Sequence, residues 1–179
     1  MSKEITISDI SDQIEAFKGS LPPVHSWQPT VDAEMDLEIR TDGTWVHEGG
    51  VIERPALVKL LASVMRREDD GRYALVTPRE RVFIRVIDVP FLIVDWSLID
   101  EKNGPQLALE SNLGEQAIVD QDNPLWLQGQ DAQPYAMVRP GLAARFTRSA
   151  YYRLADILEE QDNQWGVSSG GVFLPMLTR

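Results

Sequence analysis

Arginine side chains are the residues of this sequence that are best suited to binding chemistry. The 179 residues include thirteen Arg and only four Lys. Arg79, Arg81 and Arg85 alternate with apolar residues around a predicted strand over 81–88, so they share a strand face with Phe83. A guanidinium binds phosphate or carboxylate through paired hydrogen bonds, and a neighbouring ring can stack on a ligand. The pattern predicts a small-anion site; the alternative is that these cations form structural ion pairs with the 28 acidic residues.

Arg54 and Arg148 stand at the starts of two predicted helices, over 55–67 and 148–160. The segment Ile52-x-Arg54-x-x-Leu57-Val58-x-Leu60 is echoed by Phe146-x-Arg148-x-x-Tyr151-Tyr152-x-Leu154 at an offset of 94 residues. Each copy follows a Gly-containing turn and reads as a strand leading into a helix, which indicates a duplicated strand–helix core. Because helix N-termini attract anions, both arginines join the predicted site.

A predicted hairpin at Asp42-Gly43 carries the aromatic and imidazole candidates. A two-residue turn there pairs Ile39 with Val46, Arg40 with Trp45 and Glu38 with His47. One face then enters the core, and the other carries Glu38, Arg40, Trp45 and His47. We expect this second face at the domain interface near the Arg79–Arg85 strand; the alternative is that Trp45 packs on the helix over 55–67. The complete predicted ligand-binding set is Trp45, His47, Arg54, Arg79, Arg81, Arg85 and Arg148.

His47, oriented by Glu38, is also a candidate general base, with a hydrogen-bonded structural histidine as the alternative. No catalytic residue, metal site or cofactor is assigned. The absence of Cys excludes thiol chemistry and cysteine zinc sites, and two His residues are too few for a metal cluster. Asp120-x-Asp122 lacks the Gly and distal Glu of a calcium loop, and no phosphate-binding loop or nucleophile elbow occurs.

Net charge and hydropathy set the expected compartment and partners. A formal charge of −11 argues against nucleic acid or anionic membrane as a partner. The N-terminus is polar and acidic, and the longest apolar runs are too short to span a bilayer. We therefore expect a soluble cytoplasmic protein.

The expected fold is α+β, with two small α/β units at residues 1–79 and 80–179. A helix is predicted over 8–18 with Ser8 as its cap, and a strand over 35–40. The second unit is expected to be a curved antiparallel sheet or barrel closed by the helix over 148–160. Its strands, together with the one that ends the first unit, are predicted over 73–76, 81–88, 91–98, 106–110, 116–119, 134–139 and 143–147.

Several short motifs, in order along residues 22–160, resemble the bacterial domain-of-unknown-function family numbered 1285. They are Pro22-Pro23-Val24-x-x-Trp27-x-Pro29, Asp42-Gly43-x-Trp45-x-His47, Asp70-Gly71-x-Tyr73-x-Leu75-Val76-Thr77-Pro78, Val89-Pro90-Phe91, Pro134-Tyr135 and Val138-Arg139. The resemblance implies two domains with a duplicated core, the second pleckstrin-homology-like. It also implies a signalling role and a nucleotide-like ligand at the domain interface. Some relatives would have Cys where this chain has Thr30-Val31-Asp32-Ala33, so no thiol role carries over.

Three functions remain open from the sequence. The first is a cytoplasmic ligand-binding or signalling module for a small anionic ligand. The second is a protein-interaction scaffold without a small-molecule ligand, and the third is a hydrolase that uses His47.

Overall fold

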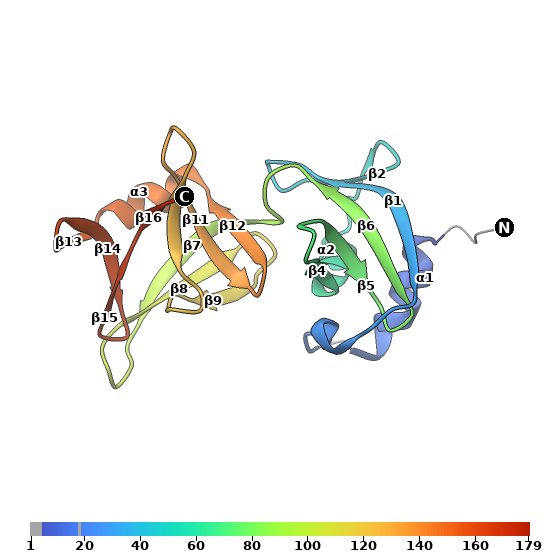
Figure 1. Ribbon diagram of the computed structural model, residues 1–179, viewed down its shortest axis with the longest axis horizontal. Helices are drawn as coiled ribbons and strands as arrows, with labels where there is room; N and C mark the ends of the chain where they lie inside the picture. The colour runs from blue at the N-terminus through green and yellow to red at the C-terminus, as the bar shows by residue number, and fades with distance from the viewer. Residues whose placement is uncertain (1–4, 18) are drawn as a thin grey trace. The chain divides into compact units, whose positions relative to one another are not determined.

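A six-stranded sheet organises the first part of the chain. The computed structural model describes residues 5–17 and 19–179, and the chain divides into two units, Met1–Asp88 and Val89–Arg179. Within the described residues the fold is mixed α+β, mostly sheet, with three α-helices (Figure 1). The boundary predicted at 79/80 falls before residues 80–86, which form a central strand of the first unit's sheet.

The N-terminal unit places two helices on one sheet face. Its helices are α1 (Ile7–Ile14) and α2 (Pro55–Ser63), with short 3-10 turns η1 (Glu15–Phe17) and η2 (Val24–Ser26). Its strands run β3-β2-β1-β6-β5-β4, where β1 is Val31–Ile39, β2 Trp45–His47, β3 Gly50–Val51, β4 Met65–Arg67, β5 Tyr73–Val76 and β6 Glu80–Val86. The largest fully buried side chains here are Ile10, Ile14, Leu37, Ile39, Trp45, Leu61, Met65 and Leu75.

Local signals fix the helix starts. Thr6 caps α1: its Oγ1 accepts from the N–H of Asp9 while the Asp9 carboxylate accepts from the N–H of Thr6. The cap is therefore Thr6 and not the predicted Ser8. Pro55 occupies the first turn of α2, where its missing N–H costs nothing. That helix ends at Ser63, before the predicted Arg67, because Met65–Arg67 pairs with β5 as a strand.

The C-terminal unit is a curled half-barrel sheet closed by a helix and a small sheet. Strands β7 (Phe91–Ile99), β8 (Gln106–Ser111), β9 (Gln116–Ile118), β10 (Leu125–Gln128), β11 (Gln133–Arg139), β12 (Leu142–Phe146) and β16 (Leu177–Thr178) run in the order β16-β10-β11-β12-β7-β8-β9. Helix α3 (Arg148–Ala155) follows, then the sheet of β13 (Glu159–Gln161), β14 (Gln164–Ser169) and β15 (Val172–Pro175). The predicted helix over 148–160 thus stops at Ala155, and β10 was not predicted.

An ion pair links two non-neighbouring parts of the curled sheet. Arg139, at the end of β11, pairs with Glu115, in the turn before β9, with Nε to Oε2 at 2.9 Å. Strands β12, β7 and β8 separate β9 from β11 in the sheet order, so the contact requires the sheet to curl. Burial raises the pKa of Glu115 and lowers that of Arg139, although each charge favours its partner's ionised form.

The duplication lies in the strands. Each unit joins two three-stranded antiparallel meanders through one central parallel pair, β1 with β6 and β7 with β12. The match is local as well: Ile39 faces Val86 and accepts from the N–H of Ile87, as Ile93 faces Phe146 and accepts from the N–H of Thr147. The helices are not equivalent, because α2 lies between β3 and β4 whereas α3 follows β12. The offset of 94 residues therefore aligns the start of α2 with the start of α3, and these two helices occupy different positions in the repeated unit.

Three hairpins in the chain use the same three-residue loop. The loops at Thr41–Gly43, Asp69–Gly71 and Asn112–Gly114 each close with an N–H to C=O bond between the flanking residues, and each ends in a glycine with φ near +80° (82°, 86° and 80°). This is the three-residue hairpin with Gly in the left-handed region. The predicted two-residue turn at Asp42-Gly43 was wrong, and the true pairs are Ile39 with Trp45, Glu38 with Val46 and Leu37 with His47.

Candidate functional site: a groove between two helices

The one-residue register change moves the hairpin candidates. Trp45 is 1% exposed and belongs to the core together with Leu37 and Ile39, so the predicted second face of Glu38, Arg40, Trp45 and His47 does not form. His47 faces Leu37 across the strands, and the Glu38 carboxylate pairs with Arg40 and Arg85. The predicted orientation of His47 by Glu38 is therefore wrong, and the general-base hypothesis loses its geometric support.

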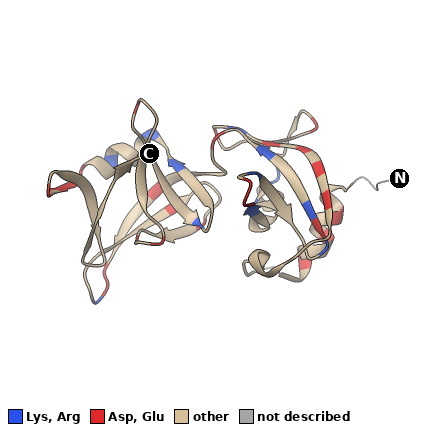
Figure 2. Cartoon of the chain, in the orientation of Figure 1, with Lys and Arg blue, Asp and Glu red and all other residues tan. Residues whose placement is uncertain are grey.

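The β6 arginines share a face with Phe83, as the alternation predicts, but acidic residues of β1 lie beside them. The parallel register sets Asp32 beside Arg81 and Glu38 beside Arg85. Figure 2 shows Asp and Glu along β1 next to the cations of β6. Arg81 binds Asp32 (Nη2 to Oδ2, 2.7 Å) and Glu68 (Nη1 to Oε2, 2.9 Å). These contacts give Arg81 and Arg85 a role in holding strands together.

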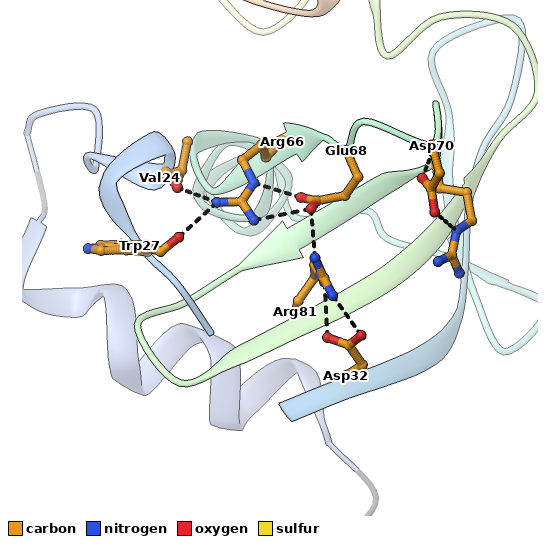
Figure 3. Close-up of polar contacts among 8 residues, drawn as sticks. Val24, Trp27, Asp32, Arg66, Glu68, Asp70 and Arg81 are labelled. Carbon is orange, nitrogen blue, oxygen red and sulfur yellow. Dashed lines mark hydrogen bonds and ion pairs between the residues drawn. The ribbon is translucent and has the colours of Figure 1, made fainter. Parts of the chain in front are cut away.

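Arg66, which was not among the predicted residues, holds the Pro-rich connector formed by residues 21–29. Its Nη1 donates to the carbonyl oxygens of Val24 (2.7 Å) and Trp27 (3.1 Å), while its Nε donates to Glu68 at 2.6 Å (Figure 3). Glu68 in turn accepts from Arg81, so one partly buried carboxylate joins β4, β6 and the connector. The sequence Arg66-Arg67-Glu68 reads as a charged turn, and only the strand pairing of β4 shows where each side chain points.

The arginines of this network lower the pKa values of the carboxyl groups of Glu68 and Asp32. Partial burial by itself raises the pKa of Glu68, but hydrogen bonds from Arg66 and Arg81 outweigh it and leave the pKa below its ordinary value of 4.5. The hydrogen bond from Arg81 holds the pKa of the Asp32 carboxyl below its usual range. At neutral pH the cluster is a saturated set of charges, which leaves little free charge for a ligand.

A groove of about 720 Å³ lies between α1 and α2. Volumes of a few hundred to a thousand cubic ångströms suit small molecules. Arg54, which the sequence analysis predicted, and Lys59, which it did not, supply positive charge. Neither side chain has an ion pair with any described residue. The other lining residues are Ile7, Ser8, Ser11, Phe17, Gly19, Ser20, Ala56, Leu57, Leu60 and Ser63.

The six predicted ligand-binding residues of the N-terminal unit do not gather at one site within that unit. Arg54 lines the groove, Arg79, Arg81 and Arg85 lie in or beside β6, and Arg148 begins α3 in the other unit. Within residues 5–17 and 19–179, no group of three or more potential metal ligands occurs. No helix in the described part of the chain is long and apolar enough to cross a membrane.

The structure defines a class: α+β proteins whose two units repeat a six-stranded frame of paired meanders. Two family models match this chain. "Domain of unknown function (DUF1285), N-terminal domain" covers residues 22–89, and "Protein of unknown function (DUF1285), C-terminal domain" covers 90–176. The chain belongs to the DUF1285 family, as the motifs in the sequence indicated. The family boundary at 89/90 falls next to the structural division at Asp88.

Two solved structures of the same family are similar to this chain. A DUF1285 family protein from Silicibacter pomeroyi is 35% identical, covers 97% of this chain and 96% of its own, and superposes with a TM-score of 0.86. A DUF1285 family protein from Shewanella baltica is 26% identical, covers 68% of this chain and 91% of its own, and gives a TM-score of 0.56. No curated protein matches the chain.

Proposed function

We propose that this protein is a cytoplasmic binding module for a small anionic ligand, and that the groove between α1 and α2 holds the ligand. The observation that carries the proposal is the pair of cations, Arg54 and Lys59, on a groove of small-molecule size without acidic partners among the described residues.

The local chemistry of α2 supports the same site. Arg54 is its N-cap residue and makes no side-chain capping bond, and Pro55 supplies no N–H. The N–H of Ala56 has no acceptor among the described residues, so it is available to an anion at the end of the groove that Arg54 lines. By contrast, Arg81 and Arg85 on β6 are already bound to carboxylates.

A thermal-shift screen with nucleotides, sugar phosphates and inorganic phosphate tests the proposal. A ligand at a hundredfold excess over its dissociation constant stabilises by about 2.7 kcal/mol, which raises the melting temperature measurably. Arg54→Gln and Lys59→Gln should abolish the shift, whereas Lys102→Gln, which removes the same charge from the turn after β7, should keep it. A flat screen, or equal loss in all three variants, contradicts the proposal.

A second candidate function is a protein-interaction surface on the C-terminal unit. Its basis is exposed apolar area: Trp165 is 56% exposed and Tyr152 62% exposed. We further propose that this unit is pleckstrin-homology-like and acts in signalling. The curled antiparallel strands with α3 packed against β7 and β12 support that likeness. Loss of a captured partner in Trp165→Ser, with retention in Arg54→Gln, would favour this function over ligand binding.

A further inference from the structure

Each helix beside the groove has one apolar face, and that face extends past the core. Ile10 and Ile14 on α1, with Val58 and Leu61 on α2, are buried. At the edge of the same faces, Ile7 from α1 and Leu57 and Leu60 from α2 are half-buried and line the groove. The edge of each apolar face therefore leaves apolar surface that a ligand can cover.

Of the four serines that line the groove, Ser11 and Ser63 already donate to backbone carbonyls of their own helix. Ser11 Oγ donates to the carbonyl oxygen of Ile7 at 2.9 Å, and Ser63 Oγ donates to that of Leu60 at 2.6 Å. Because each hydroxyl has one proton, both of these donors are already used within their own helices. The middle of the groove therefore favours an apolar body over a sugar or another polyol.

Among the described residues that line the groove, the two cations belong to α2 and its N-cap. Arg54 precedes the helix and Lys59 follows five residues later, so their backbone positions differ by roughly 7–8 Å along the axis. Arg54 and Ala56, both at the start of the helix, line this end of the groove. The groove thus combines an anion-binding end with apolar walls.

We infer that the groove binds an amphipathic anion: an alkyl or acyl chain against Ile7, Phe17, Leu57 and Leu60, with a phosphate or carboxylate head at Arg54 and Lys59. This inference rests on the proposed function and names the chemical class of its ligand. The ligand enters as a free monomer, because a chain of net charge −11 is repelled by an anionic membrane surface.

The protein contains its own reporter for this site. Phe17 lines the groove and meets the ring of Trp27 edge-on, with centroids 5.3 Å apart. Trp27 also packs against the buried cluster of Ala74, Val76 and Phe83. A chain that contacts Phe17 should change the fluorescence of Trp27, and Trp27→Phe should remove that change without removing binding measured by calorimetry.

The test uses the full-length protein with butyl, hexyl and octyl phosphate below their critical micelle concentrations, inorganic phosphate, and octyl glucoside as an uncharged amphiphile. Affinity should rise up to about fourfold for each added methylene until the groove is filled. Leu60→Gln and Ile7→Ser should flatten this dependence on chain length. Leu177→Gln, an exposed leucine on β16, should leave it unchanged.

The outcomes separate the two levels of the proposal. If inorganic phosphate binds as tightly as octyl phosphate and loses affinity in Arg54→Gln, the anion site stands and the amphipathic ligand is wrong. If octyl glucoside binds as tightly as octyl phosphate, the groove does not require an anionic head group, and that part of the inference is wrong. Binding of none of the probes overturns both. If the protein co-sediments with phosphatidylcholine vesicles that contain phosphatidate but does not bind the monomeric probes, the inference that the ligand enters as a free monomer is wrong.

Discussion

Glu68 is the residue on which the N-terminal unit's polar network depends. Its two carboxylate oxygens accept from Arg66 and Arg81, and Arg66 in turn holds two carbonyl oxygens of the connector. Side-chain exposure is only 11% for Glu68 and 13% for Arg66. Removing one member of such a set leaves buried charge without a partner, which costs more than the set contributes when complete.

Arg66→Ala should lower the free energy of unfolding by about 3 kcal/mol. The substitution leaves the Glu68 carboxylate without one of its two cationic partners and removes the hydrogen bonds that hold the connector. Urea denaturation followed by far-UV circular dichroism measures the loss. Arg85→Ala is the matched control: that side chain is 64% exposed, so its pair with Glu38 should contribute little. Equal losses in the two variants would show that burial does not distinguish these pairs.

Acid should destabilise the protein partly through Glu68. Its pKa is lowered on folding, so its contribution is complete above the ordinary value of 4.5 and is lost as pH falls through the lower folded value. Unfolding free energies between pH 7 and pH 3 should therefore fall less steeply in Glu68→Gln than in the wild type. Parallel pH profiles would assign the acid sensitivity to other carboxylates.

At the scale of elements, seven strands could be located from the sequence, but how the strands pair could not be predicted. The alternation of apolar and polar residues located β5 to β9, β11 and β12 within one or two residues. Whether the loop at Asp42-Gly43 has two or three residues depends on backbone angles that the dipeptide does not determine, and this one residue reversed the faces of Trp45 and His47. Arg54 was among the residues predicted to bind a ligand, but the groove itself was not predicted, and Lys59 gains its meaning only from the packing of α1 beside α2.

The β14–β15 hairpin should be the element least tolerant of a single added methyl group. A Cβ at Gly166 would lie 2.3 Å from the carbonyl oxygen of Leu174 and 2.7 Å from the Phe173 ring. Gly166→Ala should therefore cost about 1–3 kcal/mol, as overpacking does. Gly50→Ala is the control, since its nearest neighbour would be His47 O at 3.6 Å; a similar melting temperature for both variants would contradict the clash.

At the scale of the whole molecule, the duplication indicates that each unit holds a complete frame. The fragment 1–88 contains all six strands of its sheet, so it should unfold cooperatively on its own. The fragment 1–79 lacks β6, which pairs with both β1 and β5, and should be unfolded. Amide chemical-shift dispersion distinguishes the two states, and a folded 1–79 fragment would place the boundary where the sequence analysis set it.

The central parallel pair also determines when each unit can fold during synthesis. In the first unit Val31 pairs with Glu80, and in the second Phe91 pairs with Ala144, so the middle of each sheet joins residues about fifty positions apart. As the nascent chain leaves the ribosome, β1 emerges first and waits, with one edge unpaired, until β6 has been translated. Each half of the protein therefore passes through a period in which its future central strand is open to pairing with another chain, which makes slow decoding before residues 80 and 142 a hazard for aggregation.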